Sequence, residues 1–472
     1  MPYISTPSVC ALIPTYNNAA TVADIVRRTS AYVEHIIVVN DGSTDDTQHI
    51  LEALDVPVWL ISYPKNRGKG YALRKGLLLA KSKGFDYVLT LDADGQHYPE
   101  DIPQMLEVLS ANPCAMIVGS RSLKQENMPK KNTFANRFSN FWFTLQTGMR
   151  LPDTQTGMRL YPVRYLKGIS LLTARYEAEL ELLVFLAWAN VRIISVPIRV
   201  FYPPAEQRVS HFRPAYDFTR ITLLNVVLCI LAVVYGLPRR YGATMLYILH
   251  FLVIVLLLQP VALLCLLLGR KSHLMKRMFH RLFSSSADSL THILGCRFKD
   301  RGQIKVAEQP ALYICNHQSF LDILILLGQS PRLLILTKEY VRHNPLFAFL
   351  VRYADFPTIE DEVATNLQKL RPLVEQGYSL LVFPEGTRSE LGLPARFHKG
   401  AFFLSEQLHL PLQPLLLQGT STILPKHQLH IYRGDFSLRM LPVLQQTDTD
   451  YHTLCKQYSH FYKNLFYSQD RR

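Results

Sequence analysis

ITLLNVVLCILAVVYGLPRRYGATMLYILHFLVIVLLLQPVALLCLLL, residues 221–268, is the stretch that decides how the chain is organised. It contains only two charged side chains, Arg239 and Arg240. As helices, the run 221–237 would be about 26 Å long and the run 242–268 about 40 Å long, against a hydrocarbon thickness of roughly 30 Å. Residues 238–241 leave room only for a tight connection, so we predict a transmembrane hairpin of two helices. A buried helical pair in a soluble protein is the alternative, although soluble helices seldom run so long without polar residues.

The predicted hairpin divides the chain into an amino-terminal domain, 1–220, the hairpin, 221–268, and a carboxy-terminal domain, 269–472. The net charge is +14, from 51 basic and 37 acidic side chains. Basic residues flank the hairpin on both sides, which favours anionic lipid headgroups and places both flanks in the cytoplasm. The flanking residues are Arg208, Arg213, Arg220, Arg270, Lys271, Lys276, Arg277 and Arg281. No basic stripe interleaved with aromatic residues occurs elsewhere, so nucleic acid is not an expected partner.

The seven cysteines include no C-x-x-C pair and are expected to be reduced.

The amino-terminal domain alternates short apolar, β-branched runs with helical patterns, which predicts an α/β fold with a mostly parallel sheet. The expected strands are 10–13, 35–40, 58–62, 87–91 and 115–119, and the expected helices are 21–32, 44–54, 70–83 and 103–111. Ligands of such sheets lie at the carboxyl ends of the strands. We therefore expect the site among the polar loops that follow these strands.

The most informative loop is Asp92-Ala93-Asp94-Gly95-Gln96. Two carboxylates two residues apart, followed by an amide, offer the hard oxygen ligands that suit Mg²⁺ or Mn²⁺. A lone Asp-x-Asp is usually a solvated turn. Here, however, the loop 66–70, Asn-Arg-Gly-Lys-Gly, adds cations and glycines that suit a phosphate group at the start of a helix.

These loops, together with Gly119-Ser120-Arg121 and the run 153–159 (Asp-Thr-Gln-Thr-Gly-Met-Arg), resemble family 2 glycosyltransferases, especially the dolichyl-phosphate mannose synthase-like branch. The resemblance covers roughly residues 8–204 and implies a GT-A fold, an inverting reaction and a nucleotide-sugar donor. It implies that Asp41 contacts the base, that Asp92 lies near the ribose and diphosphate, and that Asp94 and Gln96, with Asp92, bind the divalent metal. The other implied residues of the nucleotide-sugar site are Pro14, Tyr16, Asn17 and Lys69, with Arg121 and Arg159 binding the phosphates and Asp153 and Gln155 near the sugar and acceptor.

The need for a catalytic base depends on the acceptor. A lipid phosphate is already an anionic nucleophile, whereas an alcohol must lose its proton. Three acids at the start of a predicted helix, Glu177, Glu179 and Glu181, are available. Glu177 and Glu181 share a helical face and Glu179 points elsewhere, so Glu179 is our candidate base, with solvated helix-start acids as the alternative.

The carboxy-terminal domain contains an apolar strand that ends in His317, with Asp322 five residues later. If a helix starts near His317, the Asp322 carboxylate reaches the imidazole, and His317 can then take a proton from an attacking hydroxyl. A second strand ends in Glu385-Gly386-Thr387-Arg388, where Arg388 and the backbone can hold a phosphate. A lone His with a nearby Asp is more often structural.

Together these two segments resemble the glycerolipid acyltransferase family from about residue 299 to 464. The resemblance implies that His317 and Asp322 are the catalytic pair and that Glu385, Gly386, Thr387 and Arg388 bind the acyl acceptor. The family usually has an arginine between the two segments, but here Asp355, Glu360 and Asp361 occupy that region.

We interpret the chain as a bifunctional enzyme of a bacterial inner membrane, with both domains in the cytoplasm. It would transfer a sugar to a lipid acceptor, and an acyl chain from acyl carrier protein or coenzyme A to a lipid or glycolipid hydroxyl. One alternative is a polyprenyl-phosphate sugar synthase joined to an unrelated acyltransferase. Another is a membrane scaffold with one degenerate domain.

Overall fold

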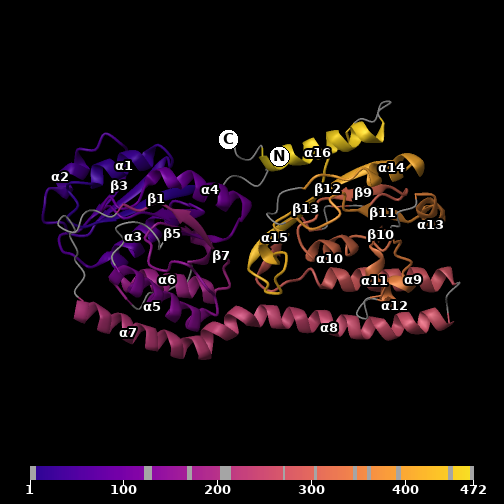
Figure 1. The fold of residues 1–472 in the computed structure, drawn as a ribbon, viewed down its shortest axis with the longest axis horizontal. Helices are drawn as coiled ribbons and strands as arrows, with labels where there is room; N and C mark the ends of the chain where they lie inside the picture. Colours follow the sequence, from indigo (N-terminus) through magenta and orange to yellow (C-terminus); the bar gives the residue numbers. More distant parts are fainter. Residues whose placement is uncertain are drawn as a thin grey trace. The chain divides into compact units, whose positions relative to one another are not determined.

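The computed structural model describes residues 7–121, 130–166, 173–201, 214–268, 272–301, 304, 306–343, 348–358, 363–389, 395–444 and 450–467. Its internal contacts divide the chain into two compact units, Met1–Gly242 and Ala243–Arg472. Each unit is built on its own β-sheet (Figure 1).

The first unit contains a seven-stranded sheet in the order β3-β2-β1-β4-β6-β5-β7. Only β6 runs antiparallel to its neighbours, β4 and β5, so the prediction of a mostly parallel α/β sheet is confirmed. The strands are β1 Val9–Thr15, β2 His35–Asn40, β3 Trp59–Ser62, β4 Tyr87–Thr90, β5 Met116–Arg121, β6 Arg159–Pro162 and β7 Ile193–Ile198.

Helices cover both faces of this sheet because the strands carry apolar side chains on both faces. One face packs against α1, α2 and α4, and the opposite face against α3, α5, α6 and α7. The helices are α1 Val22–Ser30, α2 Thr47–Glu52, α3 Lys69–Ser82, α4 Ile102–Ala111, α5 Lys130–Thr147, α6 Glu177–Trp188 and α7 Pro214–Leu231, with short 3-10 turns η1 Pro99–Asp101 and η2 Val163–Tyr165.

The second unit contains a six-stranded sheet in the order β10-β11-β9-β12-β13-β8. Within it, β12 and β13 pair antiparallel and the other neighbours are parallel. The strands are β8 Cys296–Phe298, β9 Leu312–Cys315, β10 Leu333–Ile335, β11 Ser379–Val382, β12 Leu412–Gln418 and β13 Gly434–Met440. The helices after α8 are α9 His273–Ser289, α10 Leu321–Leu327, α11 Glu339–His343, α12 Ala348–Tyr353, α13 Val363–Glu375, α14 Gly400–Gln407, α15 Thr420–Ile423 and α16 Tyr451–Tyr467.

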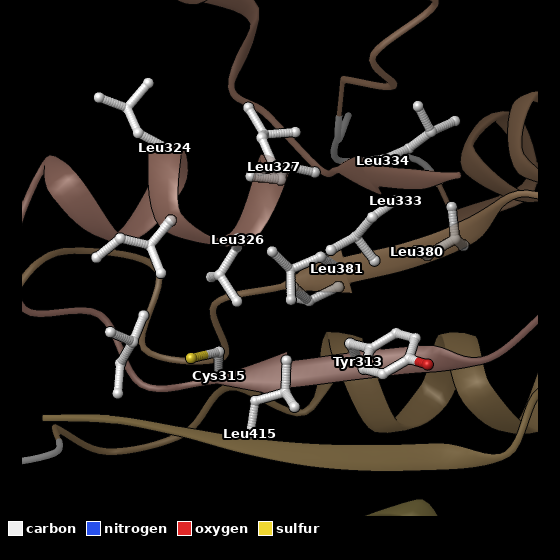
Figure 2. Close-up of a cluster of buried hydrophobic side chains, with 14 of the residues drawn as sticks. Tyr313, Cys315, Leu324, Leu326, Leu327, Leu333, Leu334, Leu380, Leu381 and Leu415 are labelled. Carbon is white, nitrogen blue, oxygen red and sulfur yellow. The ribbon is translucent and has the colours of Figure 1, made fainter. Parts of the chain in front are cut away.

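The core of the second unit holds the end of β9 in place, and His317 lies two residues beyond that end. Leu324, Leu326 and Leu327 of α10 belong to this core, and Figure 2 shows Leu326 pointing toward Cys315 of β9. The side chain of Asn316 is completely buried and exchanges two 2.8 Å hydrogen bonds with the backbone of Leu417 in β12. The backbone around His317 is therefore held by the sheet.

The predicted transmembrane hairpin is wrong. α7, a π-helical turn η4 (Ala232–Gly236) and α8 (Leu237–Leu268) form one continuous helix through residues 238–241, and Thr219–Leu268 is long and apolar enough to cross a membrane. The π turn explains why Pro238 does not end the helix: the Leu237 N–H bonds to the Ala232 carbonyl five residues back, and the widened turn accommodates a residue that cannot donate.

The two arginines that suggested a turn also have other roles. Arg240 is buried and donates to the Ala187 carbonyl at 3.0 Å. Arg239 stacks over the ring of Tyr235, with 5.3 Å from the guanidinium carbon to the ring centroid. The polar residues of 238–241 are therefore held by protein contacts and do not mark a solvated loop.

Candidate active sites

In the first unit, the loop after β2 positions the loop before α3. The carboxylate of Asp41 accepts hydrogen bonds from the N–H groups of Arg67 (2.7 Å) and Gly68 (2.8 Å). Gly68 has a φ of 98°, and a Cβ there would lie 2.6 Å from the Ala174 carbonyl oxygen, so glycine is required. Burial raises the pKa of Asp41 and the two N–H groups lower it, with a net increase. Asp41 thus fixes the start of α3, and its predicted contact with a nucleotide base stays a prediction.

The first residue of α3, Lys69, joins two acids from distant parts of the chain. Its Nζ lies 2.5 Å from Asp92 Oδ1, after β4, and 3.0 Å from Glu179 Oε2, in α6. Burial alone would lower the pKa of Lys69, but the two carboxylates raise it above its ordinary value. Burial opposes ionisation of Asp92, yet Lys69 lowers the pKa of Asp92 overall. The site therefore contains a charged, largely desolvated trio.

The predicted metal ligands fit a divalent cation by the chemistry of their donors. The Asp94 Oδ1 accepts the Gln96 N–H at 3.0 Å. Burial, followed by repulsion from Asp92, raises the pKa of Asp94, and a cation between the two carboxylates would remove that repulsion. Within the described ranges no cluster of three or more His, Cys, Asp or Glu side chains could hold a metal. Mg²⁺ needs only one or two carboxylates when substrate phosphates and water supply the rest.

The three candidate bases have different partners. Glu177 pairs with Arg220 at 2.5 Å, and Glu181 accepts from the N–H and hydroxyl of Thr173. Glu179 alone faces Lys69, and its second oxygen, Oε1, is buried and has no hydrogen-bond partner in this structure. This free oxygen is where a substrate donor could bind.

Arg121 and Asp153 form a buried bidentate pair at the end of β5, with distances of 2.6 and 2.9 Å. Burial opposes ionisation of Asp153, but Arg121 outweighs it and lowers the pKa of that carboxyl. Gln155 is exposed beyond this pair, and its N–H donates to Asp153 Oδ1 at 2.9 Å. The pair and the backbone therefore orient Gln155 at the mouth of the site.

Arg159 does not fit its predicted contact with phosphate. The residue is completely buried, and its guanidinium donates to the carbonyls of Thr156, Glu179 and Thr154 and to the Tyr161 hydroxyl. A guanidinium so surrounded by protein acceptors ties the 154–156 loop to α6. It positions Glu179, because one of its hydrogen bonds ends on the Glu179 carbonyl.

The loop after β1 contains the remaining predicted residues. Pro14 is paired with Val39 inside the sheet, and Tyr16 is half-buried at the strand end. Asn17 has a φ of 54° and receives the Thr44 N–H on its Oδ1 at 2.8 Å. The first loop is therefore tied to the loop after β2.

Two residues near Asp92 were missed from the sequence. His97 is buried, with its Nδ1 4.0 Å from Asp92 Oδ2. Gly157 lies so close to Asp92 that a Cβ would be 2.3 Å from Oδ2. The position of His97 directly after the Asp-x-Asp-Gly-Gln loop was the available sign, but a lone histidine is usually structural.

In the second unit, His317 and Asp322 lie as predicted for a base and its orienting acid. His317 Nδ1 is 2.9 Å from Asp322 Oδ2, which also accepts the N–H groups of Gln318 (2.5 Å) and Ser319 (2.7 Å). The imidazole stacks on Phe383 with ring centroids 4.1 Å apart, and the His317 side chain is 12% exposed. Since Nδ1 faces Asp322, Nε2 is the nitrogen left for a substrate.

Thr420, which the sequence did not indicate, completes this network. Its hydroxyl donates to Asp322 Oδ1 at 2.6 Å, and both residues are completely buried. Gly419, with a φ of 86°, allows the turn from β12 that brings Thr420 there; a Cβ on it would lie 2.2 Å from the Asp435 carbonyl oxygen. The Gly-Thr pair after a strand was too common a pattern to single out.

The segment 385–388 lies beside His317. Glu385 accepts the His317 N–H and the Ala395 N–H, each at 2.9 Å, so it holds the backbone of the candidate base. Burial raises the pKa of Glu385, and these N–H groups oppose the increase. Gly386 and Thr387 are exposed, and Arg388 makes no ion pair with any residue that the structure describes. Glu385 is thus structural, while 386–388 remain accessible for an acceptor.

Of the acids that replace the family's usual arginine, Asp355 pairs with Lys276 of α9. Glu360 and Asp361 lie outside the described residues. The charge of Asp355 is therefore neutralised within the protein.

Comparisons with known proteins match the two units separately. A family model described as "Glycosyl transferase family 2" matches residues 10–169, and one described as "Acyltransferase" matches residues 297–418. A UDP-N-acetylglucosamine–dolichyl-phosphate N-acetylglucosaminyltransferase of Methanococcus voltae is 31% identical over 212 residues, covering 40% of this chain and 84% of that protein.

Two matched relatives of the second unit are 1-acyl-sn-glycerol-3-phosphate acyltransferases. The protein of Cocos nucifera is 29% identical over 144 residues, covering 29% of this chain and 47% of that protein. The protein of Saccharomyces cerevisiae is 31% identical over 192 residues, covering 38% of this chain and 61% of that protein. The chain thus spans about half the length of these acyltransferases.

Proposed function

The chain belongs to glycosyl transferase family 2 and carries an acyltransferase domain, and from this premise we propose that it makes an acylated glycolipid. The first unit transfers a sugar from a nucleotide-sugar to a lipid acceptor. The second transfers an acyl chain from acyl carrier protein or coenzyme A to a lipid or glycolipid hydroxyl. Both act at the cytoplasmic face of a bacterial inner membrane.

Sugar transfer is supported by the Lys69, Asp92 and Glu179 trio. Lys69 is placed to bind the anionic diphosphate of the donor, and the start of α3 adds its N–H groups to the same side. Asp92 and Asp94, with Gln96, would hold Mg²⁺ or Mn²⁺, which neutralises the charge that develops on the leaving diphosphate. Arg121 and Asp153 orient Gln155 toward the sugar and acceptor.

Acyl transfer is supported by the His317, Asp322 and Thr420 network, the single observation that carries this half of the proposal. His317 Nε2 takes the proton of the acceptor hydroxyl as its oxygen attacks the thioester carbonyl. The carbon–sulfur bond then breaks, and His317 returns the proton to the departing thiolate. Asp322 holds the tautomer and stabilises the imidazolium, and 386–388 bind the acceptor.

The test is lipid analysis by mass spectrometry of cells that carry the wild-type protein or one of two variants. Asp94→Asn should abolish sugar transfer and leave acyl transfer intact, and His317→Ala should do the reverse. Asp24→Asn and His343→Ala change exposed residues of the same kinds and serve as matched controls. If neither Asp94→Asn nor His317→Ala alters lipid output, the bifunctional proposal is wrong, and a scaffold role becomes the better account.

A second candidate is a polyprenyl-phosphate sugar synthase whose acyltransferase modifies a different lipid. Glu179, the candidate base, already has one carboxylate oxygen bound to Lys69 at 3.0 Å, which leaves only its second oxygen to accept a proton from an acceptor. That suits an acceptor that is already ionised, such as a lipid phosphate, and the Methanococcus relative is named for such an acceptor. The two candidates separate by product: one lipid carrying both sugar and acyl chain, or two unrelated lipids.

A further inference from the structure

In a surface helix of a soluble protein the polar side chains face outward, whereas in the helix Thr219–Leu268 most outward-facing side chains are apolar. Its exposed face is apolar over most of its length, with Val234 76% exposed, Leu256 69% and Leu268 75%, although Arg239 and His250 are exposed as well. Other exposed apolar residues are Leu223, Val226, Val227, Ile230, Val233, Met245, Leu246, Leu249, Leu252, Val253, Leu257, Val261, Leu263, Leu264 and Leu267. Apolar area of this extent normally marks an interaction surface.

Polar residues of the same helix point into the protein. Asn225 accepts a hydrogen bond from Gln146 at 2.9 Å, and Arg240 donates to the Ala187 carbonyl. Thr244 accepts the Ile431 N–H at 3.0 Å. These three side chains lie on the inner face, so the outer face carries fewer polar groups than a solvated helix does.

Within each unit, the inner face of the helix packs continuously against the unit's own core. Leu224, Leu228 and Ala232 belong to the core beneath the first sheet. Tyr247, Leu258, Ala262 and Cys265 belong to the core of the second unit. The helix has enough apolar residues to cross a bilayer, but one side of each half is packed on the core of its own α/β unit, and that unit would have to enter the hydrocarbon with a crossing helix. Figure 1 shows α7 and α8 each running along the outside of its own unit.

The following helix, α9, extends the apolar surface and adds positive charge. Leu274, Met278 and Leu282 are exposed at four-residue spacing, with exposed Arg277 and Arg281 beside them. A cavity of about 330 Å³ lies at the start of α9 and is lined by His273, Lys276, Arg277, Gln376 and Tyr378. Lys276 is paired with Asp355, and the exposed Arg277 suits an anionic headgroup next to buried acyl chains. Of the other basic residues near the helix, Arg208, Arg213, Arg270 and Lys271 lie outside the described residues.

We propose that the helix lies in the plane of one leaflet and does not cross the bilayer, and that its partner is a lipid surface with anionic headgroups. An in-plane amphipathic helix buries its apolar face roughly 5–10 Å into the boundary between headgroups and acyl chains. Each unit is then attached to a lipid surface along its own length of helix. This inference rests on burial and charge and is independent of the catalytic proposal.

Depth measurements with tryptophan and brominated lipids test the proposal on the full-length protein. Leu249→Trp and Leu267→Trp are on one helical face, 18 residues or about 27 Å apart along the axis, nearly the full hydrocarbon thickness. An in-plane helix gives both the same quenching depth. Leu223→Trp and Val234→Trp make the same comparison in the first unit. The signal of the native Trp59, Trp142 and Trp188 is subtracted, and an unchanged midpoint of thermal unfolding shows that each variant is folded.

Tyr32→Trp is the control, because Tyr32 follows α1, which packs on the sheet face opposite to α7. It should not be quenched. Depths that differ by tens of ångströms between Leu249→Trp and Leu267→Trp would overturn the proposal in favour of a crossing helix. Absence of quenching at all four positions, with dimers in solution, would overturn it in favour of a second copy as the partner.

The headgroup preference is tested with vesicles of neutral lipid and of neutral lipid mixed with anionic lipid. Arg277→Gln and Arg281→Gln should each weaken binding to anionic vesicles about fivefold. Binding to neutral vesicles should not change. Equal binding of all variants to both vesicle types contradicts an anionic partner.

Discussion

Replacing Thr420 with valine removes the hydroxyl that donates to Asp322 Oδ1 at 2.6 Å. The other three donors to this carboxylate, from His317, Gln318 and Ser319, all reach Oδ2. Because Asp322 and Thr420 are completely buried, solvent does not supply a substitute donor, and Oδ1 is left unsatisfied. The carboxylate can then rotate away from the imidazole that it orients.

The magnitude follows from the strength of a hydrogen bond to a charged group, about 1.5 to 3 kcal/mol. If this loss falls on the transition state, in which His317 is an imidazolium, acyl transfer slows by roughly 10- to 150-fold. Thr420 acts through Asp322 and does not touch substrate, so we expect kcat to fall with little change in KM. Sugar transfer, in the other unit, should be unchanged in the same preparation.

The assay follows release of the free thiol from an acyl thioester, with thermal unfolding measured in parallel. Thr420→Ser keeps the hydroxyl and should retain most activity. Thr422→Val removes a hydroxyl from the same short helix that donates to the Gly419 carbonyl instead, so it controls for local packing. Near wild-type acyl transfer by Thr420→Val, while His317→Ala is inactive, would refute the assigned role.

Three further predictions follow from the site geometry and the titration of one buried group. Gly157→Ala places a Cβ 2.3 Å from Asp92 Oδ2 and should reduce sugar transfer at least tenfold, whereas Gly242→Ala, with open space around it, should have no effect in the same assay. Chelation of divalent metal should abolish sugar transfer and spare acyl transfer, and added Mg²⁺ or Mn²⁺ should restore it; persistence of sugar transfer in excess chelator contradicts the metal assignment. Burial lowers the pKa of His280 from 6.5 to about 4, so the folded state binds fewer protons than the unfolded state between these values. The free energy of unfolding should therefore fall by up to about 3 kcal/mol as the pH drops from 6.5 to 4, and His280→Leu should remove this loss in thermal unfolding at pH 5 relative to pH 7.5.

The fold class of both units could be predicted from the sequence because its causes are local. Apolar runs such as 35–40 and 312–315 end in turns and match β2 and β9. The polar loops that follow them carry chemistry that parallel strands bring to one edge. The pairing of His317 with Asp322 was predictable for the same reason, since five residues across a strand end and a helix start determine their distance.

Contacts between distant residues decided what these local patterns could not. Arg159 looked suited to phosphate, but three carbonyls surround it, including that of Glu179, which is 20 residues away. Lys69 meets Glu179 across 110 residues, and Thr420 meets Asp322 across 98. The separation of two residues along the sequence does not predict contacts over such distances in the chain.

The long apolar helix shows most clearly which features the sequence predicted and which depended on tertiary contacts. Its composition by itself predicted that residues 221–268 are helical and strongly apolar. Only the tertiary structure decided that it continues through Pro238, because a π turn precedes it and Arg240 finds an acceptor at Ala187. The physical reason is that helical preference is set by neighbouring residues, whereas the face that a helix buries is set by the surface packed against it.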